Sequence, residues 1–137
     1  MTQEDKQLLL KDLSARLPYR VHLRTNSTDD MELLDIIRDT DYEDKFWING
    51  YYDIEDIKPY LRPMSSMTEE ECKELGELPA TMDNISETFP NTPYYIEVAR
   101  VEQINWLLKK HFDFMDLIPK GLAIEVTEEN NPYENNN

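Results

Sequence analysis

The sequence predicts an α+β fold, and three local patterns lead to this expectation. Leucines recur at three- and four-residue spacing near the start of the chain, as on one side of a helix. Residues 19–25 alternate between apolar and polar side chains, as in a half-buried strand. Asn49-Gly50 is the strongest short hairpin signal in the chain. We expect an N-terminal helix, a small antiparallel sheet or SH3-like partial barrel, two further helices and a docked C-terminal segment.

The N-terminal helix is expected to begin after Thr2, whose side chain can cap it. Acidic residues in the first turn and Arg16 in the last turn suit the helix dipole. Pro18 is expected to end the helix. One side of this helix is apolar and must pack against another part of the protein. That side carries Leu9, Leu10, Leu13 and Leu17.

The first strand is expected over residues 19–25. One of its faces carries Tyr19, Val21 and Leu23. Residues 31–38 fit either a strand or a short helix. Their β-branched side chains favour a strand, but Asp29 or Asp30 can equally cap a helix, and eight residues are too few for periodicity to decide.

A hairpin with a type I′ turn is expected at Asn49-Gly50, with residues 45–48 and 51–54 as its arms. Pro59 is then expected to take residues 56–61 out of the sheet. The reason is that proline has no N–H to donate to a neighbouring strand.

A second helix is expected after a linker at residues 63–66. Thr68 and Glu71 match a capping box, and Ser66 with Glu69 is a competing frame. The helix is expected to stop near Gly76 and to bury Cys72 as a small core residue.

The rest of the chain divides into four segments. Residues 79–93 carry three prolines and predict an irregular connection, and residues 94–98 have strand composition. A third helix is expected to bury one side, formed by Val101, Ile104, Leu107, Leu108 and Phe112. Residues 114–126 are expected to dock on the domain with Gly121 as a turn.

We therefore predict a single α+β domain over residues 1–127, with a sheet region at 19–61 and a helical region at 67–126. Residues 128–137 are too polar to offset the entropy of ordering them, so we expect a disordered tail.

Composition indicates a cytoplasmic protein. The chain has 137 residues, a net charge of -15 and one cysteine, so it cannot form an internal disulfide. It lacks an apolar run of about 20 residues and a secretory signal, so no membrane association is expected.

Common catalytic and cofactor patterns are missing from the sequence. His22 and His111 are the only histidines, and no G-x-S-x-G motif is present. Three scattered glycines cannot build a phosphate-binding loop. Residues 39–50 fail as a calcium loop because Asp44 and Gly50 stand where glycine and glutamate are needed. We expect no metal, no cofactor and no enzymatic activity.

Acidity is concentrated between residues 28 and 56, where eleven Asp and Glu face two basic residues, a net charge of -9. The simplest interpretation is a solvated rim that keeps the protein soluble. The functional interpretation is a surface that docks a basic protein partner or imitates the charge of DNA. Candidate partner-binding residues are Asp39, Asp41, Glu43, Asp44, Trp47, Tyr51 and Tyr52.

Two other functions stay open. A nucleic-acid-binding small β-barrel would use the basic residues that flank the predicted sheet, although the overall charge argues against nucleic acid. These are Arg20, Arg24, Lys58 and Arg62. An enzyme of unrecognised type would need a pocket that gathers His22 or His111 with carboxylates.

Three blocks carry a resemblance to a known family. They read LLLKDLSARLPY at residues 8–19, IKPYLRPMSSMTEEE at 57–71 and WLLKKHFDFMDLIPKGLA at 106–123. The chain resembles a family of small acidic proteins of unknown function from gut Bacteroidales, their phages and mobile elements. That family more often has glycine where this chain has Arg20, which puts a turn at that position in doubt. The resemblance implies a cytosolic, mobile-element setting and no catalytic residues.

Overall fold

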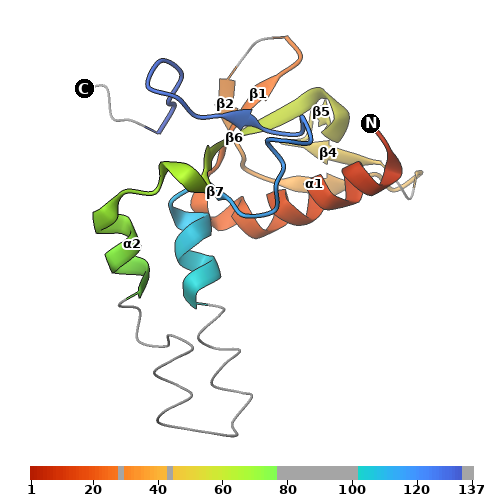
Figure 1. Ribbon diagram of the computed structural model, residues 1–137. Helices are drawn as coiled ribbons and strands as arrows, with labels where there is room; N and C mark the ends of the chain where they lie inside the picture. The colour runs from red at the N-terminus through yellow and green to blue at the C-terminus, as the bar shows by residue number, and fades with distance from the viewer. Residues whose placement is uncertain (28–29, 43–44, 77–101, 134–137) are drawn as a thin grey trace, which may run out of the picture.

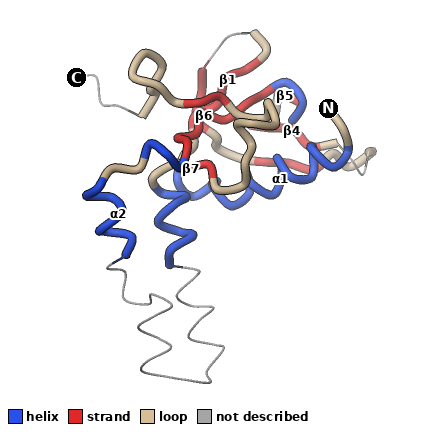
Figure 2. Tube along the Cα trace, viewed as in Figure 1, coloured by secondary structure: helices blue, strands red, loops and turns tan. Residues whose placement is uncertain are grey.

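The computed structural model describes residues 1–27, 30–42, 45–76 and 102–133. It has the predicted α+β fold, with an N-terminal helix lying along two small β-sheets (Figures 1 and 2). The strands of the described residues form one five-stranded and one three-stranded sheet and do not close into a barrel, although partial, barrel-like sheets are compatible with this arrangement.

Helix α1 spans Gln3–Arg16 and begins as the sequence predicts. The Thr2 hydroxyl accepts a hydrogen bond from the backbone N–H of Asp5 at 3.1 Å. Leu9 and Leu13 are fully buried in the core, which confirms the apolar stripe.

The chain leaves α1 through a short 3-10 turn, η1 (Leu17–Tyr19), which contains Pro18. Arg20 follows in the left-handed region with φ 53, so a turn is present although the residue is not glycine. Strand β1 (His22–Thr25) therefore starts three residues later than the alternating pattern predicts.

A buried ion pair within α1 positions the Arg16 guanidinium to bind the backbone of the sheet. Arg16 and Asp12 are both fully buried, and the Arg16 Nε donates to the Asp12 carboxylate at 2.7 Å. The Arg16 Nη2 also donates to the backbone carbonyl of Phe112 at 2.6 Å. Burial raises the pKa of Asp12, and hydrogen bonding to the Arg16 guanidinium opposes that shift. Because a buried charge needs its partner, these contacts fasten the helix to the strand that contains Phe112.

The five-stranded sheet is organised around β6 (Ile57–Pro63). Two partners come from the first half of the chain: β1 pairs antiparallel with β6, and β2 (Asp30–Glu32) pairs antiparallel with β1. Two come from the second half: β7 (Phe112–Asp113) and β8 (Ile124–Glu125) pair parallel with β6. The sheet thus extends beyond the region expected at 19–61.

The expectation that Pro59 takes the chain out of the sheet is wrong. Pro59 is buried within β6 and lies opposite Leu23 of β1. Proline removes one N–H, and a backbone hydrogen bond contributes only about 1 kcal/mol. Burying a side chain such as Ile57 or Leu61, both at most 1% exposed, contributes about 1.5–3 kcal/mol each. The burial of this apolar strand therefore outweighs the missing donor.

The three-stranded sheet consists of β3 (Ile36–Arg38), β4 (Phe46–Ile48) and β5 (Tyr52–Asp53) in antiparallel order. The predicted hairpin is present, because Asn49 and Gly50 have φ 54 and 73 and connect β4 to β5. Residues 31–38 are not helical and contribute to β2 and β3.

The Asn49 side chain also ties the hairpin to the segment between the two sheets. Its Oδ1 accepts hydrogen bonds from the N–H groups of Leu34 at 2.7 Å and Asp35 at 3.2 Å. Its Nδ2 donates to the carbonyl of Glu32 at 2.8 Å. Asn49 therefore permits the turn and also holds the hairpin against residues 32–35.

Helix α2 (Glu69–Gly76) follows the 3-10 turn η3 (Met64–Ser66) and has the predicted capping box. Glu71 donates its N–H to the Thr68 hydroxyl at 3.1 Å and accepts from the Thr68 N–H at 3.0 Å. Cys72 is exposed, so its expected place in the core is wrong. The physical reason is that α2 projects away from the two sheets (Figure 1).

The second half of the chain is partly as expected. The irregular connection predicted at 79–93 and the strand predicted at 94–98 lie outside the described residues. Residues 102–109 are helical, and this helix buries Trp106 and Leu108 while Ile104 is exposed. Phe112 lies in β7 rather than on the helix. Residues 114–126 dock as expected, with Leu117 and Leu122 buried and Gly121 at φ 74.

The packed part of the chain continues past residue 127, where the sequence predicts a tail. Tyr133 packs against the core, and its hydroxyl donates to the carbonyl of Tyr60 at 2.7 Å. The same hydroxyl accepts from the N–H of His22 at 2.9 Å. One step beyond the Leu23 and Pro59 pair, His22 would face Tyr60 in the ladder. Tyr133 thus bridges β1 and β6 where their direct pairing stops.

The Tyr133 bridge predicts a specific loss of stability. Burial raises the pKa of Tyr133, so its hydroxyl stays protonated and can donate. Tyr133→Phe leaves two backbone groups without this partner, and we expect the free energy of unfolding to fall by about 1–3 kcal/mol. Chemical denaturation measures the change, with the exposed Tyr42→Phe as the matched control. Equal stability of both variants would show that the bridge contributes nothing.

Candidate partner-binding face

The three-stranded sheet has an inner row and an outer row of side chains. Ile36, Ile48 and Tyr52 lie opposite one another across the strands and pack on the core. The alternate row across the same strands consists of Ile37, Trp47 and Asp53. Successive residues of a strand point to opposite faces, so this second row looks outward. We call the outward side chains Ile37, Asp39, Lys45, Trp47 and Asp53 the β3–β5 face.

Trp47 lies at the centre of this face and is held by its neighbours. Its indole Nε1 donates to Asp39 Oδ2 at 2.9 Å, and Lys45 Nζ lies 4.6 Å from the indole ring centroid. Asp39 Oδ1 accepts from the Asp41 N–H at 2.7 Å, which shapes the turn after β3. The hydrogen bond from Trp47 is the main reason that the pKa of Asp39 is lowered. Asp39 therefore keeps its negative charge while it orients the indole.

Exposed apolar side chains occur in β3 and on the segments that precede or connect the strands of the three-stranded sheet. Among the described residues, seven large hydrophobic side chains are exposed, and four of them lie between residues 34 and 51. These four are Leu34 at 69%, Ile37 at 49%, Tyr42 at 66% and Tyr51 at 75%. An apolar surface rimmed by charges is typical of interaction sites.

A groove of about 570 Å³ adjoins this face. It brings together three of the predicted site residues, Trp47, Tyr51 and Tyr52, and its other lining residues are Asn26, Ser27, Lys45, Asp53 and Asp56. Tyr51 and Tyr52 meet edge to face with ring centroids 4.9 Å apart. Tyr52 also packs on the core, so it contributes both to the groove and to the core.

Of the other four predicted site residues, two lie on or beside the β3–β5 face and two lie outside the described residues. Asp39 belongs to the β3–β5 face, and Asp41 lies exposed in the adjoining turn. Glu43 and Asp44 lie outside the described residues. Sequence reasoning missed Ile37 as a surface residue. Because residues 31–38 fit either a strand or a short helix, their sequence does not indicate which β-branched side chains face outward.

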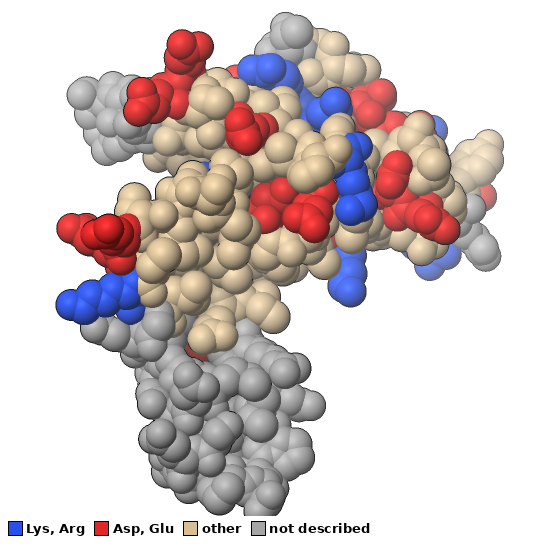
Figure 3. Space-filling view, in the orientation of Figure 1, with Lys and Arg blue, Asp and Glu red and all other residues tan. Residues whose placement is uncertain are grey.

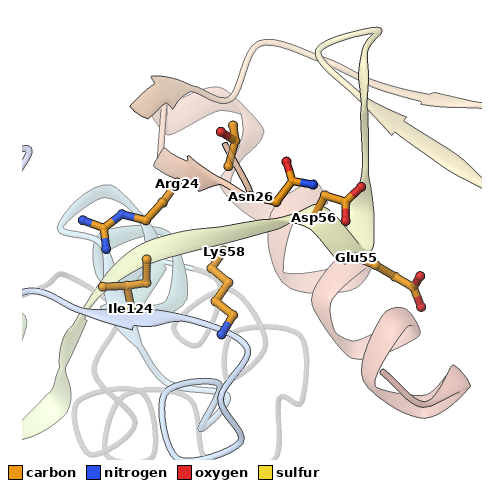
Figure 4. A pocket seen from close by; sticks show the side chains of 7 residues that line it. Arg24, Asn26, Glu55, Asp56, Lys58 and Ile124 are labelled. Atoms are coloured by element: carbon orange, nitrogen blue, oxygen red, sulfur yellow. The ribbon is translucent and has the colours of Figure 1, made fainter. Parts of the chain in front are cut away.

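Three of the four basic residues of the nucleic-acid alternative, Arg20, Arg24 and Arg62, lie within 4.0 Å of a carboxylate oxygen. Arg24 and Lys58 lie opposite each other in the sheet and line a second groove of about 350 Å³ (Figure 4). Arg62 instead makes two hydrogen bonds of 2.7 Å with Glu71, which lower the pKa of that carboxyl to about 2. Arg20 lies 4.0 Å from Glu32. Figure 3 shows basic and acidic side chains interspersed on the face in view.

Each histidine contacts a neighbouring side chain of the fold. His22 Nε2 lies 3.5 Å from a carboxylate oxygen of Glu32. His111 stacks on the Tyr133 ring at 3.7 Å between centroids, and burial lowers its pKa to about 4. Neither histidine lines the two grooves described above. Within the described ranges, no group of three or more His, Cys, Asp or Glu side chains is placed to hold a metal.

Comparison with known proteins gives no assignment. No protein-family model, curated protein or solved structure matches the chain. In the part of the chain that the structure describes, no helix combines the length and apolar character needed to cross a membrane. The function is therefore inferred from the side chains of the face and its grooves.

The His111 environment predicts a pH dependence. The unfolded histidine has a pKa of about 6.5, so below this value the unfolded chain binds a proton that the folded chain resists down to about pH 4. Stability contributed by neutral His111 is present above pH 6.5 and is lost as the pH falls towards 4, by roughly 2–3 kcal/mol. Denaturation between pH 6.5 and 5, where most carboxylates stay ionised, measures this slope. His111→Asn should flatten it, and an unchanged slope would contradict the assignment.

The Asp39 contact predicts how Trp47 responds to mutation. Trp106→Phe provides a background in which Trp47 is the single tryptophan. In that background, Asp39→Ala removes the indole partner, so we expect red-shifted emission and roughly twofold stronger acrylamide quenching, at a stability cost of about 0.5–1.5 kcal/mol. Asp41→Ala is the control, because Asp41 contributes its backbone N–H to this turn. Equal quenching in both variants would show that Asp39 does not orient Trp47.

Proposed function

We propose that the protein is a non-enzymatic interaction module that binds a basic protein partner through the β3–β5 face. One observation carries this proposal: exposed apolar side chains and the acidic excess occur in the same part of the chain. Residues 28–56 carry a net charge of -9, and residues 34–51 hold most of the large exposed hydrophobic side chains of the described residues. A rim that served only solubility would not need exposed Ile37 and Tyr51.

The two features would act at different stages of binding. The acidic field attracts a basic protein and raises the association rate. Apolar contact with Ile37 and Trp47 then supplies affinity at short range, since buried aromatic anchors dominate many interfaces. Asp39 keeps Trp47 oriented, which limits the entropy lost on binding.

A nucleic-acid ligand has less support. Arg62 is engaged by Glu71, and the chain carries a net charge of -15, which repels phosphate. A partner that itself binds DNA also fits this proposal, because the acidic residues of the 28–56 region would occupy the partner's basic surface. We place the interaction in the cytoplasm, and the resemblance of the three sequence blocks makes a basic host or phage protein the proposed partner.

Charge reversal on and away from the face tests the proposal. Asp35→Lys with Asp41→Lys reverses two exposed carboxylates beside the face, whereas Glu128→Lys with Glu129→Lys makes the same net change near the C-terminal end. Affinity capture from native lysate with quantitative mass spectrometry compares both with the unmodified protein. We expect the first pair to reduce capture of a basic partner at least tenfold and the second to preserve it.

Two outcomes would contradict the proposal. Equal losses in both double variants would mean that only the net charge matters. Unchanged capture in the Asp35 and Asp41 variant would mean that this face is not the binding surface.

A further inference from the structure

We propose that the groove beside β5 receives an arginine side chain of the basic partner. This inference rests on the proposed function and assigns the chemistry of the contact. The groove of about 570 Å³ lies next to the hairpin and combines aromatic side chains with the carboxylates of Asp53 and Asp56. Aromatic faces and carboxylates together favour a delocalised cation.

The chain's own Lys45 shows that this groove accommodates a cation. Its ammonium lies 4.6 Å from the Trp47 ring centroid and 4.0 Å from Asp53 Oδ2. Lys45 also lines the groove, so its ammonium occupies one edge of the aromatic surface. Tyr51 and Tyr52 extend that surface and are available to a second cation.

The carboxylates of the groove exceed the charge that Lys45 supplies. Asp53 Oδ1 accepts from the Glu55 N–H at 3.0 Å, and among the described residues its Oδ2 contacts only Lys45 Nζ, at 4.0 Å. The side-chain carboxylate of Asp56 makes no hydrogen bond or ion pair with any residue in the described ranges. The groove therefore holds two carboxylates and one ammonium. An entering cation neutralises the remaining negative charge.

The neighbouring groove limits where that cation can bind. Both grooves share Asn26 and Asp56, but the second carries Arg24 and Lys58. Figure 4 shows Asn26 next to Asp56, with Lys58 and Arg24 further along the sheet. Glu55 also lines the second groove, so two carboxylates balance its two cations, whereas the groove beside β5 keeps one negative charge in excess. A partner cation is therefore favoured on the Trp47 side of Asp56.

Arginine suits this groove better than lysine. A planar guanidinium stacks on Trp and Tyr rings and can present two N–H groups to one carboxylate. Lysine provides a strongly hydrated point charge, which gains less from the aromatic surface. The groove should therefore distinguish the two side chains although both are cationic.

Single-cation peptides test the assignment directly. The probes are three flexible Gly/Ser nonapeptides that differ only in a central Arg, Lys or Gln, and the readout is chemical-shift perturbation of backbone amides. We expect the Arg peptide to bind with a Kd of about 1 mM. Its shifts should be confined to residues 45–56, with roughly threefold weaker binding of Lys and none of Gln. Equal binding of the Gln peptide would overturn the proposal.

Three substitutions sharpen the result. Asp56→Asn should weaken Arg-peptide binding roughly fivefold. Glu55→Gln is the matched control, because Glu55 pairs with Lys6 at 3.1 Å and does not line this groove. Lys45→Met removes the competing ammonium and should tighten binding about threefold. No effect of Asp56→Asn, or weaker binding in Lys45→Met, would show that the groove does not hold the guanidinium.

Failure of this inference and failure of the proposed function are distinguishable. If Asp35→Lys with Asp41→Lys abolishes partner capture but the Arg peptide does not bind, the face is correct and the groove assignment is wrong. If capture is unaffected by that double variant, the proposed function fails whatever the peptide does.

Discussion

Backbone pairing along β6 holds the two halves of the chain together. Its backbone is shared by β1 from the first half of the chain and by β7 and β8 from the second. The Tyr133 hydroxyl continues the link between β1 and β6 beyond their last direct pair. Segments more than 60 residues apart are therefore joined at one strand, whose Tyr60 and Leu61 are almost fully buried.

The position of β6 also determines where the candidate face lies. The 3-10 turn η2 (Ile54–Asp56) leads from β5 directly into β6, and Asp53 caps that turn through the Glu55 N–H. Because Ile48, Ile54 and Ile57 share one core, the hairpin is anchored on its inner side. The anchored inner row leaves Ile37, Trp47 and Asp53 facing outward. The proposed binding surface is thus a consequence of how the hairpin packs.

Sequence reasoning succeeded where neighbouring residues alone decide the conformation. The Thr2 cap, the Thr68 and Glu71 capping box and the Asn49-Gly50 turn each depend on contacts within a few residues. It failed at Pro59, because the burial of a whole strand outweighed a local preference. It failed at Cys72, because the direction in which α2 leaves the sheets cannot be read from the helix itself.

The features of the candidate site also fall into two groups, those that local sequence decides and those that tertiary packing decides. Three of its features are evident from the amino-acid sequence, because they follow from composition and short-range turn chemistry: the acidic excess of residues 28–56, the hairpin and the aromatic side chains on it. Tertiary packing sets the others: which side chains face outward, the hydrogen bond between Trp47 and Asp39, and the groove that Asp56 shares with Tyr51. The physical reason is that a strand's faces are assigned by its register with distant partners. A shift of one residue would exchange the buried and exposed rows.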